Sequence, residues 1–335
     1  MSTPNIKDFL NINFSFAPNS SWKAGDYSNL LSLAVGNLTY LETINSPFLP
    51  NADSFHLHLT ETGISELHNN FRFITKEQLK RLGKVILIID ETHEPYYGSK
   101  KDAWVHDYKP EKGCTGSYKF MCVSVLKGEK RFFVDAVPLS VFSDTKKILR
   151  EMLSYLKTIV CIKVVLMDRG FNSGEIIDIF EDLRLKYLML YRETAGVKPL
   201  IEKTKNYGKQ KYLVNKKHET NLVIIKEQIK GKEIVWIFAT NLGNCFSYIK
   251  LYKKRWNIET GFRVCDEARI KTKSRKIETR YFLFLIAFLF YNGWKTFCNE
   301  PLKRVLLELT MKIFFEKHRD LFLSMAMKIL SKYPT

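Results

Sequence analysis

The chain has 335 residues, of which 45% are hydrophobic, and its 53 Lys and Arg exceed its 35 Asp and Glu, for a formal net charge of +18. This composition supplies enough apolar side chains for a core and excludes a globally disordered chain. The basic excess is not expected of an enzyme of small metabolites. It indicates a polyanionic partner, because each phosphate that Lys or Arg neutralises releases a counterion and adds affinity.

The cysteine spacing and the hydropathy of the chain indicate the compartment in which the protein works. The six cysteines include no CxxC pair, which argues against a zinc site and a disulfide framework and favours a reducing interior. The first residues lack the basic and then apolar pattern of a signal peptide. The most apolar run, Tyr281 to Phe290, is shorter than the ~20 residues of a membrane span. We therefore expect a buried core helix there, a cytoplasmic (nucleoid-associated) protein, and no membrane partner.

Residues 1–82 predict a mostly helical N-terminal region. The run SNLLSLAVGNL has helical spacing, and Thr75 with Gln78 has the spacing of a capping box at a helix start. His56 and His58 alternate as strand neighbours do and are interpreted as surface or core histidines, because no third metal ligand is evident. A helical module in a basic protein indicates recognition of a DNA end or packing for the domain that follows, and both interpretations stay open.

The middle of the chain alternates strand and helix patterns. VILIID, which ends at Asp90, precedes two strand-like runs separated by KGEK, and then a helix capped by Ser143 or Asp144. KVVLMD, which ends at Asp168, a helix begun by Ser173, and the strand KYLML follow. This order predicts an α/β fold with a mixed sheet flanked by helices, the succession of an RNase H-like core.

The alternation of strand and helix patterns stops at residue 192. Residues 192–232 are rich in Lys with alternating apolar runs, which predicts a basic β-rich insertion or a merely solvated hairpin. The strand EIVWIFATN then returns to the core, Ser247 starts a long helix that carries Glu259, and the remainder is helical. The predicted division is an N-terminal helical region, a core, an insertion and a C-terminal helical region: 1–82, 83–191 with 233–296, 192–232, and 297–335.

Three acids are candidates for one site. Asp90 and Asp168 each end a strand pattern, and two such strands side by side would place their carboxylates together. Glu259, on a helix packed against that sheet, could complete a pocket for divalent cations. Mg²⁺ prefers oxygen ligands, and two ions about 4 Å apart can clamp the attacking and leaving oxygens of a phosphoryl displacement.

The helix around Glu259 carries a polar stripe. Tyr252, Arg255, Glu259 and Arg263 fall on one face of a 3.6-residue period. An ion pair of Arg255 with Glu259 is one explanation. The other is a phosphate-handling site, in which Glu binds metal, Arg donates to phosphate oxygens and Tyr adds a hydrogen bond.

The combined motifs resemble the DDE transposases of prokaryotic insertion sequences, in the branch with a Tyr-x2-Arg-x3-Glu-x6-Lys signature. YKKRWNIETGF supplies Tyr252, Arg255 and Glu259 at that spacing, and DETHEPYYG, DRGF and IETRYFLFLIAFLFYNGW extend the similarity. Some archaeal insertion-sequence transposases are similar in the same segments. The resemblance covers roughly residues 85–294.

The resemblance implies a mechanism and its residues. Asp90, Asp168 and Glu259 would bind two Mg²⁺ or Mn²⁺ ions, and Tyr252 and Arg255 would position phosphates, with no covalent protein–DNA intermediate. The substrate would be double-stranded DNA, at the terminal inverted repeats and in the target, and the protein would work as a homodimer on paired ends.

The resemblance raises three further expectations, about the signature Lys, the β-rich insertion and two tryptophans. The signature Lys falls at Asp266; Lys271, Lys273 or Arg275 is a candidate to take over its DNA contact, unless this subgroup works without one. The β-rich insertion helps to hold DNA ends in the family, and in some members an aromatic ring stacks on a displaced base. Trp236 and Trp256 are candidates for stacking, but we expect both to be buried core residues.

Two other functions are compatible with the same residues. One is a non-catalytic DNA-binding protein derived from a transposase, which keeps the basic surface. The other is an RNase H-like nuclease without strand transfer. The intact Asp, Asp and Glu set favours the transposase.

Overall fold

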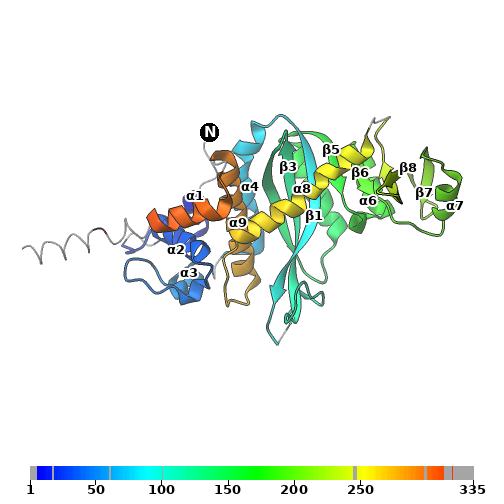
Figure 1. Cartoon of the computed structure of the whole chain (residues 1–335). Helices are drawn as coiled ribbons and strands as arrows, with labels where there is room; N and C mark the ends of the chain where they lie inside the picture. The colour runs from blue at the N-terminus through cyan, green and yellow to red at the C-terminus, as the bar shows by residue number, and fades with distance from the viewer. Residues whose placement is uncertain are drawn as a thin grey trace, which may run out of the picture. The chain divides into compact units, whose positions relative to one another are not determined.

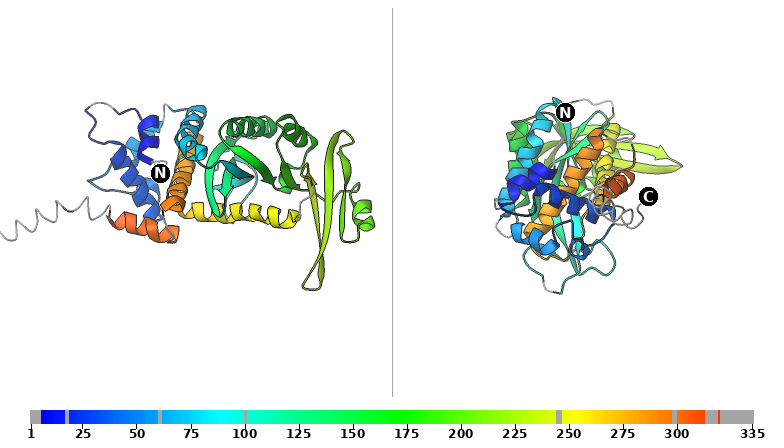
Figure 2. Two further views of the ribbon diagram at one scale, coloured as in Figure 1. Left: turned by 90° about the horizontal axis from the view of Figure 1, so that it is seen from above. Right: turned by 90° about the vertical axis from the view of Figure 1, so that its left-hand side faces the viewer.

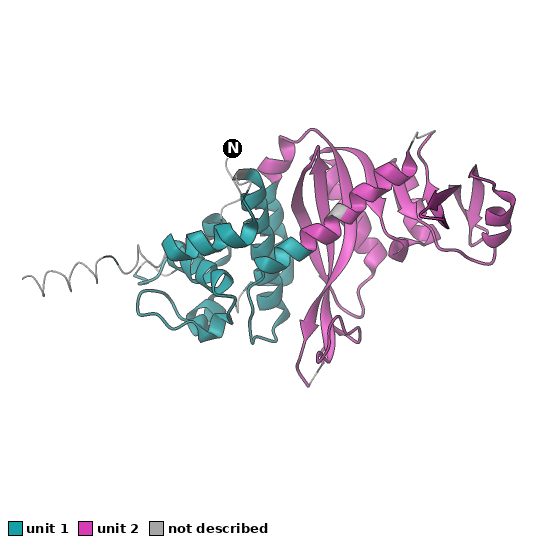
Figure 3. Ribbon diagram, viewed as in Figure 1, with its two compact units in different colours: residues 1–75, 263–335 teal, residues 76–262 magenta. Residues whose placement is uncertain are grey.

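The computed structural model (Figure 1) describes residues 6–16, 19–59, 62–99, 101–243, 247–297, 300–312 and 319. The chain divides into two units (Figure 3): a sheet unit, residues 76–262, and a helical unit, residues 1–75 with 263–335. This division differs from the predicted one at residues 263–296, which were assigned to the core and which cluster with the N-terminal helices.

One mixed sheet organises the sheet unit. In the described part of the chain it has nine strands, which run in the order β2-β3-β1-β5-β6-β9-β8-β7, with β4 paired to β3. β1 pairs antiparallel with β3 and parallel with β5, and β5 pairs parallel with β6. The predicted RNase H-like mixed sheet is therefore confirmed. The strands are β1 Lys84–Tyr96, β2 Val105–His106, β3 Gly116–Lys127, β4 Lys130–Leu139, β5 Cys161–Met167, β6 Tyr187–Leu190, β7 Tyr207–Val214, β8 His218–Ile229 and β9 Lys232–Thr240.

Helices cover both faces of this sheet, as the left view of Figure 2 shows: α5 and α6 lie on one face and α8 on the other. Asp144 accepts hydrogen bonds from the first turn of α5, and Ser173 does the same for α6, so both predicted helix starts are confirmed. On the other face, Phe262 of α8 stacks on Phe133 of β4. The helices of this unit are α5 Thr145–Lys157, η2 Arg169–Phe171, α6 Gly174–Asp182, α7 Lys198–Lys203 and α8 Tyr248–Glu267, whose last residues, from Arg263, belong to the helical unit.

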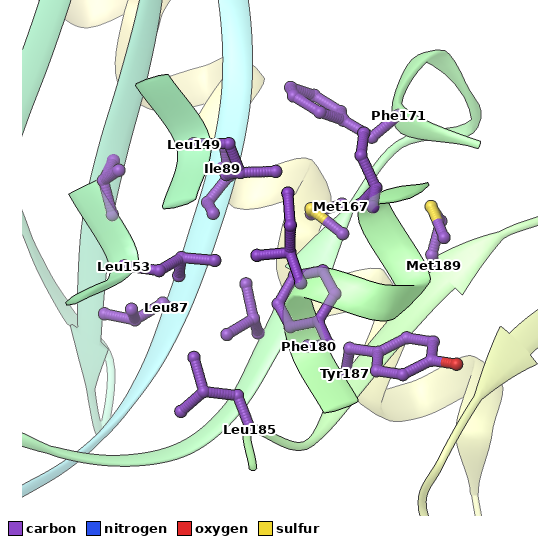
Figure 4. Close-up of a cluster of buried hydrophobic side chains, with 14 of the residues drawn as sticks. Leu87, Ile89, Leu149, Leu153, Met167, Phe171, Phe180, Leu185, Tyr187 and Met189 are labelled. Atoms are coloured by element: carbon purple, nitrogen blue, oxygen red, sulfur yellow. The ribbon is translucent and has the colours of Figure 1, made fainter. Parts of the chain in front are cut away.

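The main core lies between the sheet and the helices α5 and α6 (Figure 4). Leu87 and Ile89 of β1 are fully buried there with Leu153 of α5 and Phe180 of α6. Successive residues of a strand point to opposite faces. Asp90 therefore points to the face that α8 covers, and the alternation that builds the core also aims this carboxyl group.

The predicted β-rich insertion continues the core sheet. β7 and β8 form a hairpin whose turn holds Asn215 and Lys216 at positive φ. β8 pairs with β9, and β9 pairs with β6 of the core. A second turn, with Gly231 at a φ of 76°, joins β8 to β9. Backbone hydrogen bonds thus connect the insertion to the strands that carry the acidic residues.

The helical unit is built around aromatic side chains. Phe282 of α9 stacks on Phe9 of α1 and on Phe14, with ring centroids 5.2 and 5.6 Å apart. Residues Tyr281 to Phe290 are buried throughout, so the predicted core helix is confirmed. Its helices are α1 Ile6–Asn13, α2 Ala24–Gly36, η1 Leu41–Thr43, α3 Ala52–Leu59, α4 Ile64–Lys80, which continues into the sheet unit, and α9 Ile277–Phe297.

Two local predictions for this region are wrong. Thr75 lies inside α4 and donates to the carbonyl of Phe71 at 3.0 Å, so Thr75 and Gln78 do not begin a helix. His56 and His58 lie on α3 and not on a strand. Both patterns span four residues or fewer, whereas the helices that contain them begin earlier, at Ile64 and Ala52. Of the predicted C-terminal helical region, residues 302–312 are helical, and most of the rest lies outside the described residues.

Among the described residues, none of the helices has the length and apolar character needed to cross a bilayer.

Candidate active site

The two aspartates lie side by side at the level where β5 ends, but Asp90 lies inside β1, so the prediction that Asp90 ends its strand is wrong. Ile89 of β1 pairs with Met167 of β5, so Asp90 and Asp168 are the next residues at the same level. β1 continues beyond this point against β3, whereas β5 ends, and Asp168 caps the short helix η2 by accepting from the backbone N–H of Arg169 at 2.7 Å. The predicted adjacency of the two carboxyl groups is present.

Arg255 of α8 connects the acids. Its Nη1 donates to Asp90 Oδ2 at 3.0 Å and its Nη2 to Glu259 Oε1 at 2.7 Å. Its Nε donates to the hydroxyl oxygen of Tyr252 at 3.1 Å, and that hydroxyl donates to Asp168 Oδ1 at 3.2 Å. Two members of the helical stripe predicted from the sequence, Tyr252 and Arg255, therefore contact the two aspartates.

Burial shifts the pKa values of these side chains. Burial raises the pKa of Asp90 to about 6, with Asp168 and Glu259 adding to the effect, although Arg255 and the N–H of Glu91 oppose it. Burial also raises the pKa of Tyr252 well above its usual value, so the phenol stays a neutral donor. Burial alone would lower the pKa of Arg255, but the groups around it raise it, and the guanidinium stays charged although its side chain is only 4% exposed.

A pocket of about 420 Å³ opens beside this network. Its wall combines charged groups with apolar side chains of the sheet and of α8. The lining residues are Asp168, Arg169, Leu190, Ile234, Val235, Trp236, Tyr252, Arg255, Trp256 and Glu259.

The two tryptophans of the pocket differ in exposure. Trp236 is buried, as expected, and its ring lies 6.1 Å from that of Trp256. Trp256 is 46% exposed, so the prediction that it belongs to the core is wrong. The indole Nε1 of Trp236 is buried and has no hydrogen-bond partner among the described residues. The pocket thus has an aromatic side and an ionic side.

The chemistry of the three carboxylates suits a divalent cation, but their placement in this conformation does not. The oxygen donors are those that Mg²⁺ prefers. However, the guanidinium group of Arg255 lies between Asp90 and Glu259. In the described part of the chain, three or more His, Cys, Asp or Glu side chains nowhere gather closely enough to hold a metal ion.

The other predicted DNA-binding residues belong to the helical unit. Arg263 is exposed on α8, one turn beyond Glu259. Asp266, which stands where the family signature has Lys, pairs with Arg269 at 2.7 Å. Lys271, Lys273 and Arg275 follow in a segment outside the helices.

That segment, residues 270–276, will be called the basic segment, and its side chains alternate. Lys271, Lys273 and Arg275 are exposed, whereas Ile270 and Thr272 are buried. Alternate exposure is typical of extended backbone, in which successive side chains point to opposite sides. These three positions, and the exposed Lys276 that follows them, all carry a positive charge.

Glu42 holds the basic segment from one side. Its carboxylate accepts from the hydroxyl of Thr272, from the backbone N–H of Lys273 at 2.9 Å and from His56 at 3.0 Å. Arg280 of α9 holds the other side, because its guanidinium donates to the carbonyls of Thr272 and Ser274 at 3.0 and 2.9 Å. Sequence reasoning missed Glu42, and no local pattern around it points to a segment about 230 residues away.

Glu42 provides a pH-dependent test of this anchoring. Burial would raise the pKa of Glu42, but its hydrogen bonds outweigh burial and lower it to about 2. A carboxylate whose folded-state pKa lies below the unfolded value stabilises the fold at neutral pH. This contribution, about 3 kcal/mol, should disappear as the pH falls from about 5 to about 2.

Urea unfolding followed by circular dichroism at pH 7, 5 and 3 measures this effect. We expect Glu42→Gln to be less stable than the wild type at pH 7, with the difference shrinking at pH 3. Glu66→Gln, at an exposed position of α4, is the matched control and should stay within about 0.5 kcal/mol of the wild type. Equal stability of Glu42→Gln and wild type at pH 7 would show that the anchoring is energetically unimportant.

The comparisons with known proteins define the family. A family model described as a transposase DDE domain matches residues 81–292, more than half of the chain. The chain therefore belongs to the transposase DDE domain family. The comparison with curated proteins finds no match.

Among solved structures, the Drosophila P element transposase strand transfer complex is similar at 11% sequence identity and a TM-score of 0.22. The alignment covers 92% of this chain and 67% of that chain. A likeness at this level carries no argument about the function of the chain.

Proposed function

We propose that this protein is a DNA transposase of an insertion sequence, which cleaves DNA at the terminal repeats of its element and joins the ends to target DNA. Asp90, Asp168 and Glu259 are its catalytic acids. The observation that carries the proposal is the convergence of these acids on Arg255 and Tyr252 beside a pocket. Membership in the transposase DDE domain family supports the same function.

Divalent cations complete the proposed site. Asp90, Asp168 and Glu259 would hold two Mg²⁺ or Mn²⁺ ions, which would activate the attacking hydroxyl group and stabilise the leaving oxygen. The side chains of the protein orient the substrate. Arg255, once free to turn toward the pocket, donates two parallel hydrogen bonds to a phosphate, and the neutral phenol of Tyr252 donates another.

The aromatic side of the pocket suits a nucleobase. Trp256 is partly exposed beside the ionic groups, and an exposed indole ring stacks on an unpaired base with little sequence preference. Lys253 lies above the ring of Trp236, with its Nζ 5.9 Å from the ring centre, and adds a positive charge near the same wall. Phosphate and base would thus be bound on the two sides of one pocket.

Further DNA contacts follow from the charge of the chain. Arg263 and the basic segment, with Lys271, Lys273 and Arg275, would contact phosphates of the bound duplex. The Lys-rich insertion would hold DNA ends. Two ends have to be cut together, so we propose a homodimer that works on chromosomal DNA in the cytoplasm.

The test is cleavage of a labelled duplex that carries the end of the element, with Mg²⁺ or Mn²⁺. We expect the wild type to nick the end, and Glu259→Gln to bind the duplex but to cleave about a thousandfold more slowly, because a lost metal ligand removes about 4 kcal/mol of transition-state stabilisation. Glu175→Gln, at an exposed carboxylate on α6, is the matched control and should cleave normally.

The alternatives give different results. Binding without cleavage by the wild type under either metal would support the non-catalytic DNA-binding protein. Cleavage without any joined product would support the RNase H-like nuclease.

A further inference from the structure

The guanidinium group of Arg255 occupies the position where a shared cation of the acids would be expected. Its three nitrogens bind Asp90, Glu259 and Tyr252 at 3.0, 2.7 and 3.1 Å. The Arg255 side chain is 4% exposed and that of Asp90 17%, so this half of the network is buried. A buried carboxylate requires a paired charge, and in this conformation Arg255 supplies it.

A divalent ion would need the same oxygens. Asp90 Oδ2 and Glu259 Oε1 already accept from Arg255, and a metal ion placed between them would face a buried positive charge within a few ångströms. Arg255 and divalent ions therefore compete for the same carboxylates.

The contact of Arg255 with Glu259 is the part of this network that is accessible to solvent. Glu259 is 60% exposed, unlike Asp90, so its contact with Arg255 can be replaced by water. Arg255 also lines the pocket, where a phosphate can reach it. A phosphate offers a planar guanidinium two acceptor oxygens, which makes it a good replacement for the two carboxylates.

We propose that Arg255 is the internal counter-cation of the resting site, and that a DNA phosphate in the pocket draws it away from Asp90 and Glu259 so that divalent ions can bind. This inference rests on the proposed function and adds an order of events. DNA binding and metal binding become coupled, and each strengthens the other by the same factor. The DNA-free protein is thereby prevented from assembling a reactive metal site.

The first experiment measures Mn²⁺ binding by the full chain, from the electron paramagnetic resonance signal of free Mn²⁺. The ion is titrated with and without a saturating concentration of the duplex, and ions bound by the duplex alone are subtracted. We expect the wild type to bind Mn²⁺ weakly without DNA and about tenfold or more tightly with it. Equal affinity in the two conditions would overturn the proposal while leaving the transposase function intact.

The second experiment removes the counter-cation. Arg255→Gln should bind Mn²⁺ about tenfold more tightly than the wild type without DNA, and should lose most of the gain that DNA provides. Arg169→Gln, which removes the same charge from the wall of the same pocket, should change the affinity much less. A similar increase in both variants, or none in Arg255→Gln, would overturn the proposal. Absence of Mn²⁺ binding in every variant and condition would overturn the metal site as well.

Discussion

Asp168→Asn is expected to lose DNA cleavage by about a thousandfold or more while it keeps the stability of the wild type. Asp168 Oδ1 accepts from the N–H of Arg169 and from the hydroxyl of Tyr252, at 2.7 and 3.2 Å. The amide oxygen of Asn can accept the same two hydrogen bonds. The substitution therefore removes the negative charge, and with it about 4 kcal/mol of metal-assisted stabilisation, and leaves the local structure in place.

Single-turnover cleavage and thermal unfolding measure the two halves of this prediction. Asp182→Asn is the matched control, since Asp182 belongs to an ion pair with Arg150 at 2.6 Å in which both side chains are about half exposed. This control should lose less than about 1 kcal/mol and cleave normally. Unfolding of Asp168→Asn would show that the network around Arg255 is structural, and wild-type cleavage would remove Asp168 from the site.

Simultaneous replacement of Lys271, Lys273 and Arg275 by Ala is expected to weaken DNA binding by about a hundredfold or more at moderate salt. Each lost phosphate contact reduces the slope of log affinity against log salt by about 0.9. Three contacts therefore make the slope shallower by about 2.7. Glu42 accepts from Thr272 and from a backbone N–H, and Arg280 donates to a backbone carbonyl, so these anchors of the basic segment do not depend on the three replaced side chains.

A filter or anisotropy titration in EDTA, from low to high salt, tests this result independently of metal and cleavage. The matched control replaces Lys76, Lys80 and Arg81 by Ala, which removes two Lys and one Arg from exposed positions around the end of α4. A change of slope as large in this control as in the basic-segment variant would mean that net charge alone sets the affinity. No change in either variant would exclude the basic segment as a DNA contact.

The parts of the fold that were predicted correctly are those in which apolar and polar residues alternate regularly over a short stretch of sequence. VILIID and KVVLMD are short apolar runs that end in an acid, and both lie on strands whose acids are at the same level, although β1 continues to Tyr96. Asp144, one of the two predicted candidates, and Ser173 are helix caps, since a side-chain acceptor satisfies the free N–H groups of a first turn wherever the helix lies. Tyr252, Arg255 and Glu259 likewise share one face of α8, and the periodicity of a single helix is enough to predict this.

The predictions that failed depended on context beyond a few residues. Thr75 has the spacing of a helix start but lies within a helix that begins at Ile64. Trp256 is predicted to be a buried core residue, yet its position on α8 leaves it partly exposed at the pocket. Exposure depends on which neighbours cover a side chain, and no local period carries that information.

The acids that follow the two apolar runs, the polar stripe and the basic character of residues 271–275 are visible in the sequence, because short-range periodicity and residue chemistry are local. Which of these groups meet depends on the folded chain. Arg255 contacts Asp90 across 165 positions of the chain, and Glu42 holds the backbone of Lys273 across 231. Such contacts depend on strand order, register and helix placement, which are set by packing of the whole chain. The pairing of a buried guanidinium with the acids, from which the order of DNA and metal binding is inferred, therefore emerges only in the folded protein.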